Sequence, residues 1–280
     1  MFNVKPQTPI IDWSNPLTRN LEYSLSLKEG SSPNVFDEVR ERASVTVNSP
    51  SWKKTAFGNG LGLVSTSSQY VDTLYPISLG ASDSLTVSIL AKISSATGTG
   101  QRVLFGSVTA SGNFPEFMCG VGDGSFGGRA RMYISGTTSG NSYANNSTTD
   151  YRDDKWHLFT FVRNGSTATI KILVDGVQVD SVADTTTGGI TFSTFAYVGV
   201  ENNTGAPNTQ YVDMDIAQVL IHKRALSVYE IQRLYQDPFS IYRRQQSFLR
   251  SLSTIFGSTP LKLQTGLFLK LETGTRIKTE

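Results

Sequence analysis

Residues 156–180 read WHLFTFVRNGSTATIKILVDGVQVD and residues 216–235 read IAQVLIHKRALSVYEIQRLY, and the order of these two stretches decides the fold. In the first stretch, side chains alternate as they do on a strand with two different faces. Asn164-Gly165 and Asp175-Gly176 interrupt the alternation, and both pairs contain residues that adopt the positive φ of tight hairpin turns. The first stretch therefore predicts two successive β-hairpins.

The second stretch predicts a strand followed by a short helix. Ser227 stands three residues before Glu230, which is the capping-box spacing that satisfies backbone donors at a helix start. Asp237-Pro238 predicts the helix end, because a proline disfavours the helical conformation of the residue before it. The apolar face of this helix is expected to contain Val228, Ile231 and Leu234.

The strand predicted near residues 85–92 has two distinct sides. Leu85, Val87, Ile89 and Ala91 alternate with Thr86, Ser88 and Lys92. Such alternation is typical of a sheet with one buried and one solvated face. We therefore expect one wet face on this sheet.

The composition fits an all-β protein. Hydrophobic residues make up 38% and charged residues 17% of the 280 residues, with 25 glycines for turns. The net charge of +2 comes without a broad cationic stripe, which argues against nucleic-acid binding. Cys119 is the only cysteine, so no intrachain disulfide forms. Neither classical secretion nor membrane insertion is expected, since the sequence has no charged leader with an apolar run and no long apolar segment.

The motifs W-H-x-F, D-G and R-A-L-S-x-x-E-I-x-x-L-Y, in this order, closely resemble the laminin G-like branch of the concanavalin A-like lectin/glucanase superfamily. Earlier motifs in the order of that family are 12–17 (DWSNPL), Trp52, 60–62, 70–72 and 85–88. The resemblance implies a jelly-roll β-sandwich with one short C-terminal helix and a β-rich C-terminal tail. We divide the chain into an N-terminal arm (1–20), the sandwich (21–240) and the tail (241–280).

A further resemblance concerns the context of the protein. The motifs IDW-x-NPL near the N-terminus and LY-x-DPFSIYRR after the helix are similar to laminin G-like proteins of tailed bacteriophages. This resemblance implies a non-catalytic virion structural protein, a capsid decoration or a tail or fibre component, assembled in the host cytoplasm. Its expected partners are other virion subunits, copies of itself and host-surface glycans. A cellular carbohydrate-binding adhesin is an alternative.

The tail contains a small repeat. Residues 261–266 read LKLQTG and residues 269–274 read LKLETG, and Ile277-Lys278 continues the eight-residue spacing. Two or three such strands bury too little apolar area to stand alone. We expect residues 247–280 to mediate oligomerisation or docking to another subunit, and a hairpin folded back on the sandwich is the alternative.

Catalysis is not expected. A glycan-cleaving, glucanase-like enzyme needs two carboxyl groups roughly 5–10 Å apart. The E-x-D-x-x-E and E-x-D-x-E spacings of the glucanase branch do not occur in the sequence. The acidic cluster Asp37, Glu38 and Glu41 has arginines beside it and looks like a solvated segment, so its acids are expected to be structural or surface residues. The two histidines, His157 and His222, fit structural roles because no nucleophile and base stand together.

Two kinds of binding residue are predicted. Calcium is considered because laminin G-like domains often bind it at the sandwich rim, and the oxygen ligands proposed here are Asp213, Asp215 and Asp123. Exposed strand charges are the alternative for these aspartates. Carbohydrate binding needs aromatic rings that cover sugar faces and amide groups that bond sugar hydroxyls. The alternative is that the asparagines are ordinary turn formers and the tyrosines are rim residues without a ligand. The predicted sugar-binding residues are Tyr143, Asn145, Asn146, Asn202, Asn203, Asn208 and Tyr211.

Overall fold

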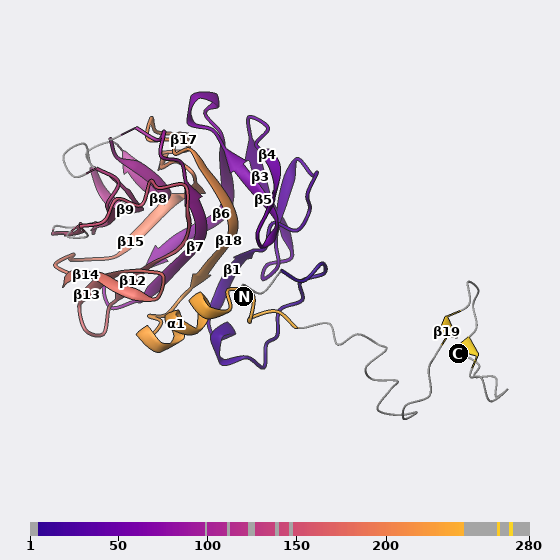
Figure 1. Ribbon diagram of the computed structural model, residues 1–280. Helices are drawn as coiled ribbons and strands as arrows, with labels where there is room; N and C mark the ends of the chain where they lie inside the picture. Colours follow the sequence, from indigo (N-terminus) through magenta and orange to yellow (C-terminus); the bar gives the residue numbers. More distant parts are fainter. Residues whose placement is uncertain are drawn as a thin grey trace. The chain divides into compact units, whose positions relative to one another are not determined.

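The structure is a computed structural model that describes residues 5–98, 100–110, 113–122, 127–137, 140–145 and 148–243, together with 262–263 and 269–270. The chain divides into two compact units, Met1–Arg243 and Arg244–Glu280. The first unit is an antiparallel β-sandwich with one α-helix, which confirms the predicted fold class (Figure 1).

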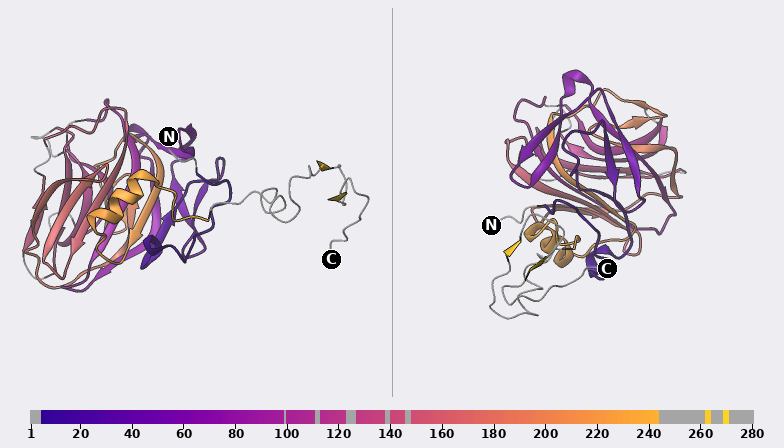
Figure 2. Two further views of the ribbon diagram at one scale, coloured as in Figure 1. Left: turned by 60° about the horizontal axis from the view of Figure 1, so that its bottom comes forward. Right: turned by 90° about the vertical axis from the view of Figure 1, so that its right-hand side faces the viewer.

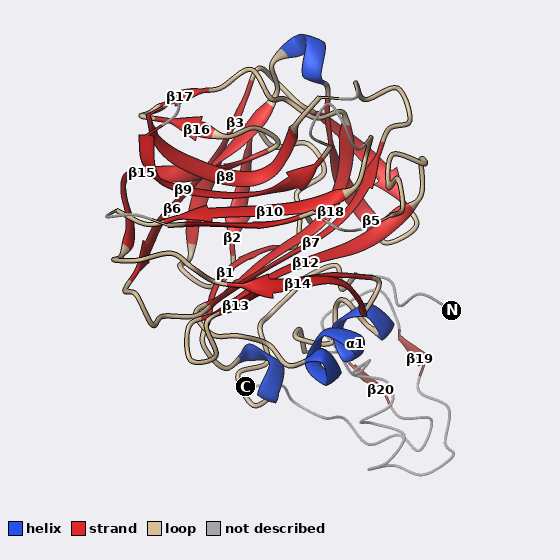
Figure 3. Ribbon diagram, turned by 90° about the vertical axis from the view of Figure 1, so that its left-hand side faces the viewer, coloured by secondary structure: helices blue, strands red, loops and turns tan. Residues whose placement is uncertain are grey.

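Two sheets form the layers of the sandwich (Figure 3). Sheet I contains β1 (Leu21–Leu25), β4 (Ser51–Thr55), β5 (Gly58–Leu63), β7 (Leu85–Ile93), β12 (Trp156–Asn164), β13 (Thr169–Val174), β14 (Val177–Ala183) and β18 (Met214–His222). Sheet II contains β2 (Asn34–Asp37), β3 (Arg42–Val47), β6 (Tyr70–Leu79), β8 (Arg102–Ala110), β9 (Asn113–Val121), β10 (Ala130–Ser135), β11 (Asn141–Ala144), β15 (Ile190–Val198), β16 (Asn202–Asn203) and β17 (Ala206–Pro207).

In sheet I the strand order is β4-β5-β18-β7-β12-β13-β14, and β1 pairs with the other end of β18. In sheet II it is β2-β3-β6-β15-β8-β9-β10-β11. The pair Leu25 and Asp37 joins β1 to β2, so hydrogen bonding continues from one sheet into the other. The short β16 is the exception to antiparallel pairing, because it runs parallel to β8.

The main core lies between the sheets. Alternate residues of each strand point into it, such as Val87 and Ile89 from β7 and Phe159 and Phe161 from β12. Cys119 of β9 belongs to the same core, and burial raises the pKa of its thiol. Burial of these side chains, with no disulfide in the chain, holds the two layers together.

The predicted hairpins are present, but one turn differs. Asp175 and Gly176 have φ angles of 54° and 78°, as a two-residue turn between β13 and β14 requires. Asn164 and Gly165 do not have positive φ, so the tight turn expected there is wrong. A longer loop joins β12 to β13, and the Asn164 side chain accepts hydrogen bonds from the Ser166 amide and hydroxyl groups.

The helix α1 (Val228–Gln236) follows the prediction at both ends. The Ser227 hydroxyl accepts from the Glu230 amide, the Glu230 carboxylate accepts from the Ser227 amide, and Asp237 follows the last helical residue. Ile231 and Leu234 are buried. Val228 is 39% exposed, so the buried part of the predicted apolar face consists of Ile231 and Leu234.

The outer face of sheet I is covered where β7 crosses it, so the solvated face expected for this strand is wrong. Thr86 and Ser88 of β7 are buried, and Leu90 on the same strand belongs to a second apolar cluster. This cluster includes Ile231 and Leu234 of α1, which lies across the strands of sheet I (Figure 2). Small hydroxyl side chains fit beneath a covering helix, and Thr86 bonds the Arg224 carbonyl and the Leu226 amide there.

The segment expected to be an N-terminal arm lies against the sandwich from Lys5 onward. Ile11 forms an isolated antiparallel bridge with Tyr242, and the Arg243 amide donates to the Ile10 carbonyl. Leu17, in the 3₁₀ helix η1 (Pro16–Thr18), is fully buried in the second cluster. Residues 5–20 and 239–243 therefore pack as parts of the first compact unit.

In the second unit, β19 (Lys262–Leu263) pairs antiparallel with β20 (Leu269–Lys270). The pair Lys262 and Lys270 joins the middle residues of the two LKL copies, so the repeat forms a hairpin-like pair. The rest of the tail lies outside the described residues, and its role in oligomerisation or docking stays a prediction. In the described ranges, no helix has the length and hydropathy needed to span a bilayer.

Candidate binding face on sheet II

The outer face of sheet II carries polar and aromatic side chains where sheet I carries its helix-covered apolar cluster. On β10, Met132 and Ile134 point into the core, so Arg131 and Tyr133 point outward. On β15, Ala196 and Val198 point into the core, so Tyr197 points outward. We call the outward group the aromatic face, which consists of Tyr70, Tyr133, Tyr143, Phe195, Tyr197 and the adjoining Tyr211.

Tyr70, Tyr197 and Tyr211 form one cluster of this face. The ring centroids of Tyr70 and Tyr197 are 4.7 Å apart, and those of Tyr70 and Tyr211 are 6.4 Å apart. The Tyr197 hydroxyl donates to the Gly205 carbonyl at 3.3 Å. Burial raises the pKa of Tyr197 to about 12, and the nearby Asp72 carboxylate adds to the effect. Tyr197 therefore stays a neutral phenol at physiological pH.

Tyr133 and Tyr143 form the second cluster, across β10 and β11. Their rings meet edge to face with centroids 6.2 Å apart, and Tyr143 is 36% exposed. The Arg131 guanidinium lies 4.9 Å from the Tyr143 ring centroid and donates to the Gly122 carbonyl at 2.9 Å. This cation–π contact and hydrogen bond hold the Tyr143 ring in place while one side stays open to solvent.

The hairpin of β16 and β17 lies beside β8 and contributes amide groups. Asn202 is buried, donates to the Phe195 carbonyl and accepts from the Gly205 amide. This side chain stabilises the hairpin, so it is not available to a ligand. Asn203 is half-buried, and the Asn208 amide donates to a Glu201 carboxylate oxygen at 3.2 Å.

The predicted sugar-binding residues do not form a single group. Tyr143 and Asn145 lie at the β10 and β11 side of sheet II, and Tyr211 lies with Tyr70 at the β6 side. Asn146 lies outside the described residues. Tyr70, Tyr133, Tyr197, Phe195 and Arg131 were not predicted, although alternation along β10 and β15 would have marked most of them as outward-facing.

A comparison with protein-family models matches residues 65–232 to the concanavalin A-like lectin/glucanases superfamily. The chain belongs to this superfamily. The matched range begins in the 3₁₀ helix η2 (Ser65–Ser67) and ends inside α1, so it contains most strands of both sheets. A sequence search of curated proteins gave no significant match.

Solved structures with the same fold include binding domains of bacterial toxins. The binding domain of Paraclostridial Mosquitocidal Protein 1 has 14% identity and a TM-score of 0.60, over 78% of this chain and 52% of that chain. The botulinum neurotoxin DC binding domain in complex with SialylT has 14% identity and a TM-score of 0.55, over 78% and 52%. This chain therefore spans about half the length of these toxin domains.

Domain 4 of AbnA, an extracellular arabinanase from Geobacillus stearothermophilus, was solved in complex with arabinotriose. It has 12% identity and a TM-score of 0.55, over 78% of this chain and 98% of that chain. At such identities the likeness shows the fold alone.

One carboxyl pair in this superfamily member was not predicted from the sequence. Glu116 of β9 and Glu201 share a hydrogen bond, and burial with the adjacent Glu201 charge raises the pKa of Glu116 to about 8. Glycoside hydrolysis needs carboxyl groups about 5–9.5 Å apart, with the sugar between them. Groups in direct contact, with Glu201 buried, do not have that geometry.

The acidic cluster of residues 37–41 is less solvated than expected. Asp37 is fully buried and forms an ion pair with Arg40 at 2.7 Å. Glu38 accepts hydrogen bonds from the Ser26 amide at 3.2 Å, and burial raises its pKa to about 7. The expected solvation is wrong for Asp37 and Glu38, and their role is structural, because they join β2 to the end of β1 and to Ser26 after it. Glu41 is exposed.

The two histidines have structural partners. His157 Nδ1 lies 2.7 Å from an Asp175 carboxylate oxygen, and Nε2 lies 3.2 Å from Asp153. His222 is buried with Nε2 2.8 Å from the Leu17 carbonyl, and burial lowers its pKa to about 4. His222 is therefore neutral at physiological pH, while His157 joins β12 to the turn after β13.

His157 makes stability depend on pH. Burial opposes its charge, but hydrogen bonds and charge from Asp175 and Asp153 raise the pKa overall. A histidine whose folded pKa exceeds its unfolded value of about 6.5 stabilises the fold below that pH. We expect this contribution to disappear as pH rises through the folded pKa. Urea unfolding of wild type and His157→Gln at pH 5.5 and 8.5 measures it. Equal differences between the two proteins at both pH values would contradict the assignment.

Asp213 and Asp215, the predicted calcium ligands, line one rim cavity of about 490 Å³. The two oxygens of Asp215 pair with Lys53 Nζ at 2.5 Å and Lys92 Nζ at 2.8 Å. Asp213 accepts from the Ser65 amide at 2.7 Å and hydroxyl at 2.8 Å. A calcium ion would have to displace two ammonium groups.

Asp123, the third proposed calcium ligand, lies outside the described residues. Within the described ranges, His, Cys, Asp and Glu side chains do not gather in groups of three or more that suit a metal ion.

Proposed function

We propose that the chain is a non-catalytic carbohydrate-binding protein that holds glycans on the aromatic face of sheet II. The observation that carries this proposal is the difference between the two sheets. An apolar cluster on the outer face of sheet I is buried beneath α1 and N-terminal residues such as Leu17, whereas on the outer face of sheet II Tyr143 is 36% and Phe195 is 39% exposed. Exposed apolar patches often mark binding sites, and the edge-to-face pair of Tyr133 and Tyr143 is the patch that we assign to the glycan.

The chemistry of the face suits a neutral sugar. The open side of Tyr143 and the neighbouring Tyr133 offer a surface for the C–H groups of a pyranose or furanose ring. Asn141 and the tyrosine hydroxyl groups lie on the same strands and offer donors and acceptors for sugar hydroxyls. The arabinotriose and SialylT complexes of structures with the same fold support the choice of ligand class.

Tyr143→Ala tests the proposal. We expect it to weaken binding of an oligosaccharide such as arabinotriose, or of the best ligand on a glycan array, by about fivefold or more, because stacking on one ring contributes about 1 kcal/mol. Calorimetric titration measures the change. Tyr229→Ala is the matched control, since Tyr229 is a highly exposed tyrosine on α1 and lies off the aromatic face.

Equal affinity of the Tyr143 variant and wild type, or failure of every glycan to bind, would refute the aromatic face as a glycan site. New reducing ends in an incubated glycan sample would favour the enzymatic alternative, with Glu116 as the first residue to replace.

We further propose that this binding domain is a phage virion component. The support is the resemblance of residues 11–17 and 234–244 to phage laminin G-like proteins and the separate second unit after Arg243. Antibody labelling of purified phage particles tests the proposal. Recovery of the protein from the surface of cells that lack virions would instead favour a cellular adhesin.

A further inference from the structure

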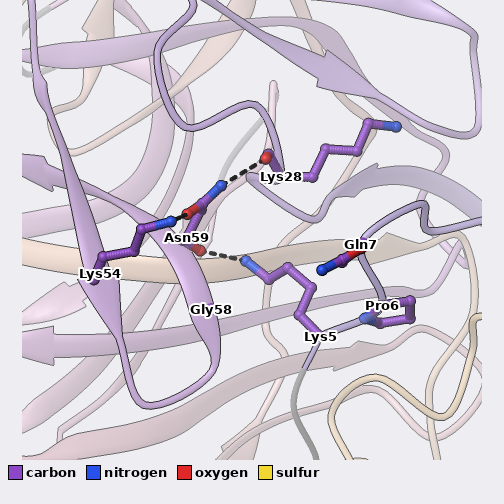
Figure 4. A pocket seen from close by; sticks show the side chains of 7 residues that line it. All are labelled: Lys5, Pro6, Gln7, Lys28, Lys54, Gly58 and Asn59. Atoms are coloured by element: carbon purple, nitrogen blue, oxygen red, sulfur yellow. Dashed lines mark hydrogen bonds between the residues drawn. The ribbon is translucent and has the colours of Figure 1, made fainter.

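A basic cavity of about 330 Å³ lies away from the aromatic face, where Lys5, Pro6 and Gln7 meet the β4–β5 hairpin (Figure 4). Its lining includes Lys5, Lys28 and Lys54, and none of the described residues that line it is acidic. A cavity with several ammonium groups and no carboxylate in its wall favours an anionic ligand.

Asn59 positions two of the three ammonium groups of this cavity, those of Lys5 and Lys54. Lys54 Nζ donates to Asn59 Oδ1 at 2.6 Å, and Lys5 Nζ donates to the Asn59 carbonyl at 2.6 Å and to the Ala217 carbonyl at 2.9 Å. The Asn59 amide in turn donates to the Lys28 carbonyl at 2.8 Å. These partners are neutral, so they orient Lys5 and Lys54 without cancelling their charge, while the Lys28 ammonium group lies 5.3 Å from the Phe36 ring centroid.

Lys5 is the least exposed of the three lysines. Burial lowers its pKa to about 7, against the charges of Glu38 and Glu29, which raise it. The Phe239 ring lies 5.6 Å from its ammonium group. An anion in the cavity would restore the stabilisation that the ammonium group loses by leaving water.

A second cavity, of about 500 Å³, shares Lys28 with the first. Its wall contains Trp13, which is 56% exposed, and Ile10, which is 57% exposed. Arg243 and Glu41 lie in the same wall and offer a hydrogen-bond donor and an acceptor. In such an arrangement the exposed indole ring packs against the apolar face of a sugar ring, and the neighbouring charged groups form hydrogen bonds with its hydroxyl groups.

We propose that the two cavities form a second saccharide site, which takes an acidic oligosaccharide. One sugar ring stacks on Trp13, and anionic substituents, either carboxylate or sulfate, bind Lys28 and Lys54. Lys28 belongs to both cavities, so it connects the ring position with the anion position. This site differs from the aromatic face in both residues and ligand charge.

Calorimetric titration of the full chain with a trigalacturonate, a sulfated trisaccharide and neutral maltotriose tests the proposal. We expect at least one anionic ligand to bind, and Lys54→Met to weaken it roughly tenfold, since one charged hydrogen bond contributes about 1.5 kcal/mol or more. Trp13→Ala is expected to weaken it by about fivefold or more. Whichever anionic ligand binds more tightly identifies the substituent.

Two controls separate this site from others. Lys223→Met removes an exposed lysine that lines neither cavity and should leave affinity unchanged. Tyr143→Ala, which weakens the aromatic face, should also leave the acidic ligand unaffected. The proposal fails if maltotriose competes equally, or if Lys54→Met and Trp13→Ala both bind as wild type does. It also fails if inorganic sulfate binds as tightly as the oligosaccharides.

The pH dependence gives an independent readout. Between pH 6 and pH 8.5 Lys5 loses its proton and Glu38, whose pKa burial raises to about 7, gains negative charge. Affinity for the acidic ligand should therefore fall by about tenfold, whereas arabinotriose binding should stay constant. An affinity for the acidic ligand that rises with pH would overturn the proposal.

Discussion

Replacement of Arg163 by methionine is expected to lower the free energy of unfolding by about 3–5 kcal/mol, because it breaks a buried ion pair and leaves the partner charge uncompensated. Arg163 Nε lies 2.7 Å from the Asp184 carboxylate, and both side chains are buried. The guanidinium also donates to the carbonyls of Gly80, Ala81 and Asp83 at 2.8–3.1 Å. One side chain thus closes the loop before β7.

Urea denaturation of the purified variant measures this loss. Arg233→Met is the matched control, because Arg233 lies on the exposed side of α1, and its change should stay within about 0.5 kcal/mol. Arg163→Lys keeps the charge but loses the planar set of hydrogen-bond donors. Its loss of unfolding free energy should therefore lie between those of Arg163→Met and Arg233→Met. An unchanged unfolding midpoint in Arg163→Met would show that the Asp184 loop is held by other contacts.

Ile231→Ala is expected to destabilise the fold by about 2–5 kcal/mol, because Ile231 is fully buried between α1 and sheet I and its removal leaves a cavity. Val228→Ala is the comparison on the same helix. Val228 is 39% exposed, so its truncation should cost below about 1 kcal/mol. Thermal unfolding of both variants checks the difference. Similar losses for the two variants would mean that α1 covers sheet I with a different face.

The parts of the fold that local chemistry determines were predictable from the sequence. The Asp175-Gly176 turn and the Ser227 capping box depend on neighbouring residues alone, and both are present. The outer face of sheet I was not predictable in this way. Thr86 and Ser88 look like solvent-facing residues until a helix from far along the chain covers them. The alternation of residue types along one strand distinguishes its two faces, but it does not identify the distant segments that cover each face.

The binding residues show the same limit. Tyr143 and Tyr211 were identified by residue type in polar loops, yet their partners Tyr133 and Tyr70 come from other strands. Asn202 has the residue type of a sugar ligand, but its hydrogen bonds are all used within its own hairpin. The contact between Glu116 and Glu201 depends on β15 and its following loop lying beside β8 and β9.

The bridge between Ile11 and Tyr242 brings the two ends of the sandwich together, so the order of its strands along the chain can be changed by circular permutation. Two positions that are adjacent in space can be linked by a few residues, and new ends can then be opened at an exposed turn such as that between β12 and β13. Circularly permuted versions joined at this bridge should therefore keep the strand pairing of both sheets and the aromatic face, whereas they lose Lys5, Pro6 and Gln7 from the basic cavity. Such rearranged chains would allow the two units to be fused to other scaffolds separately.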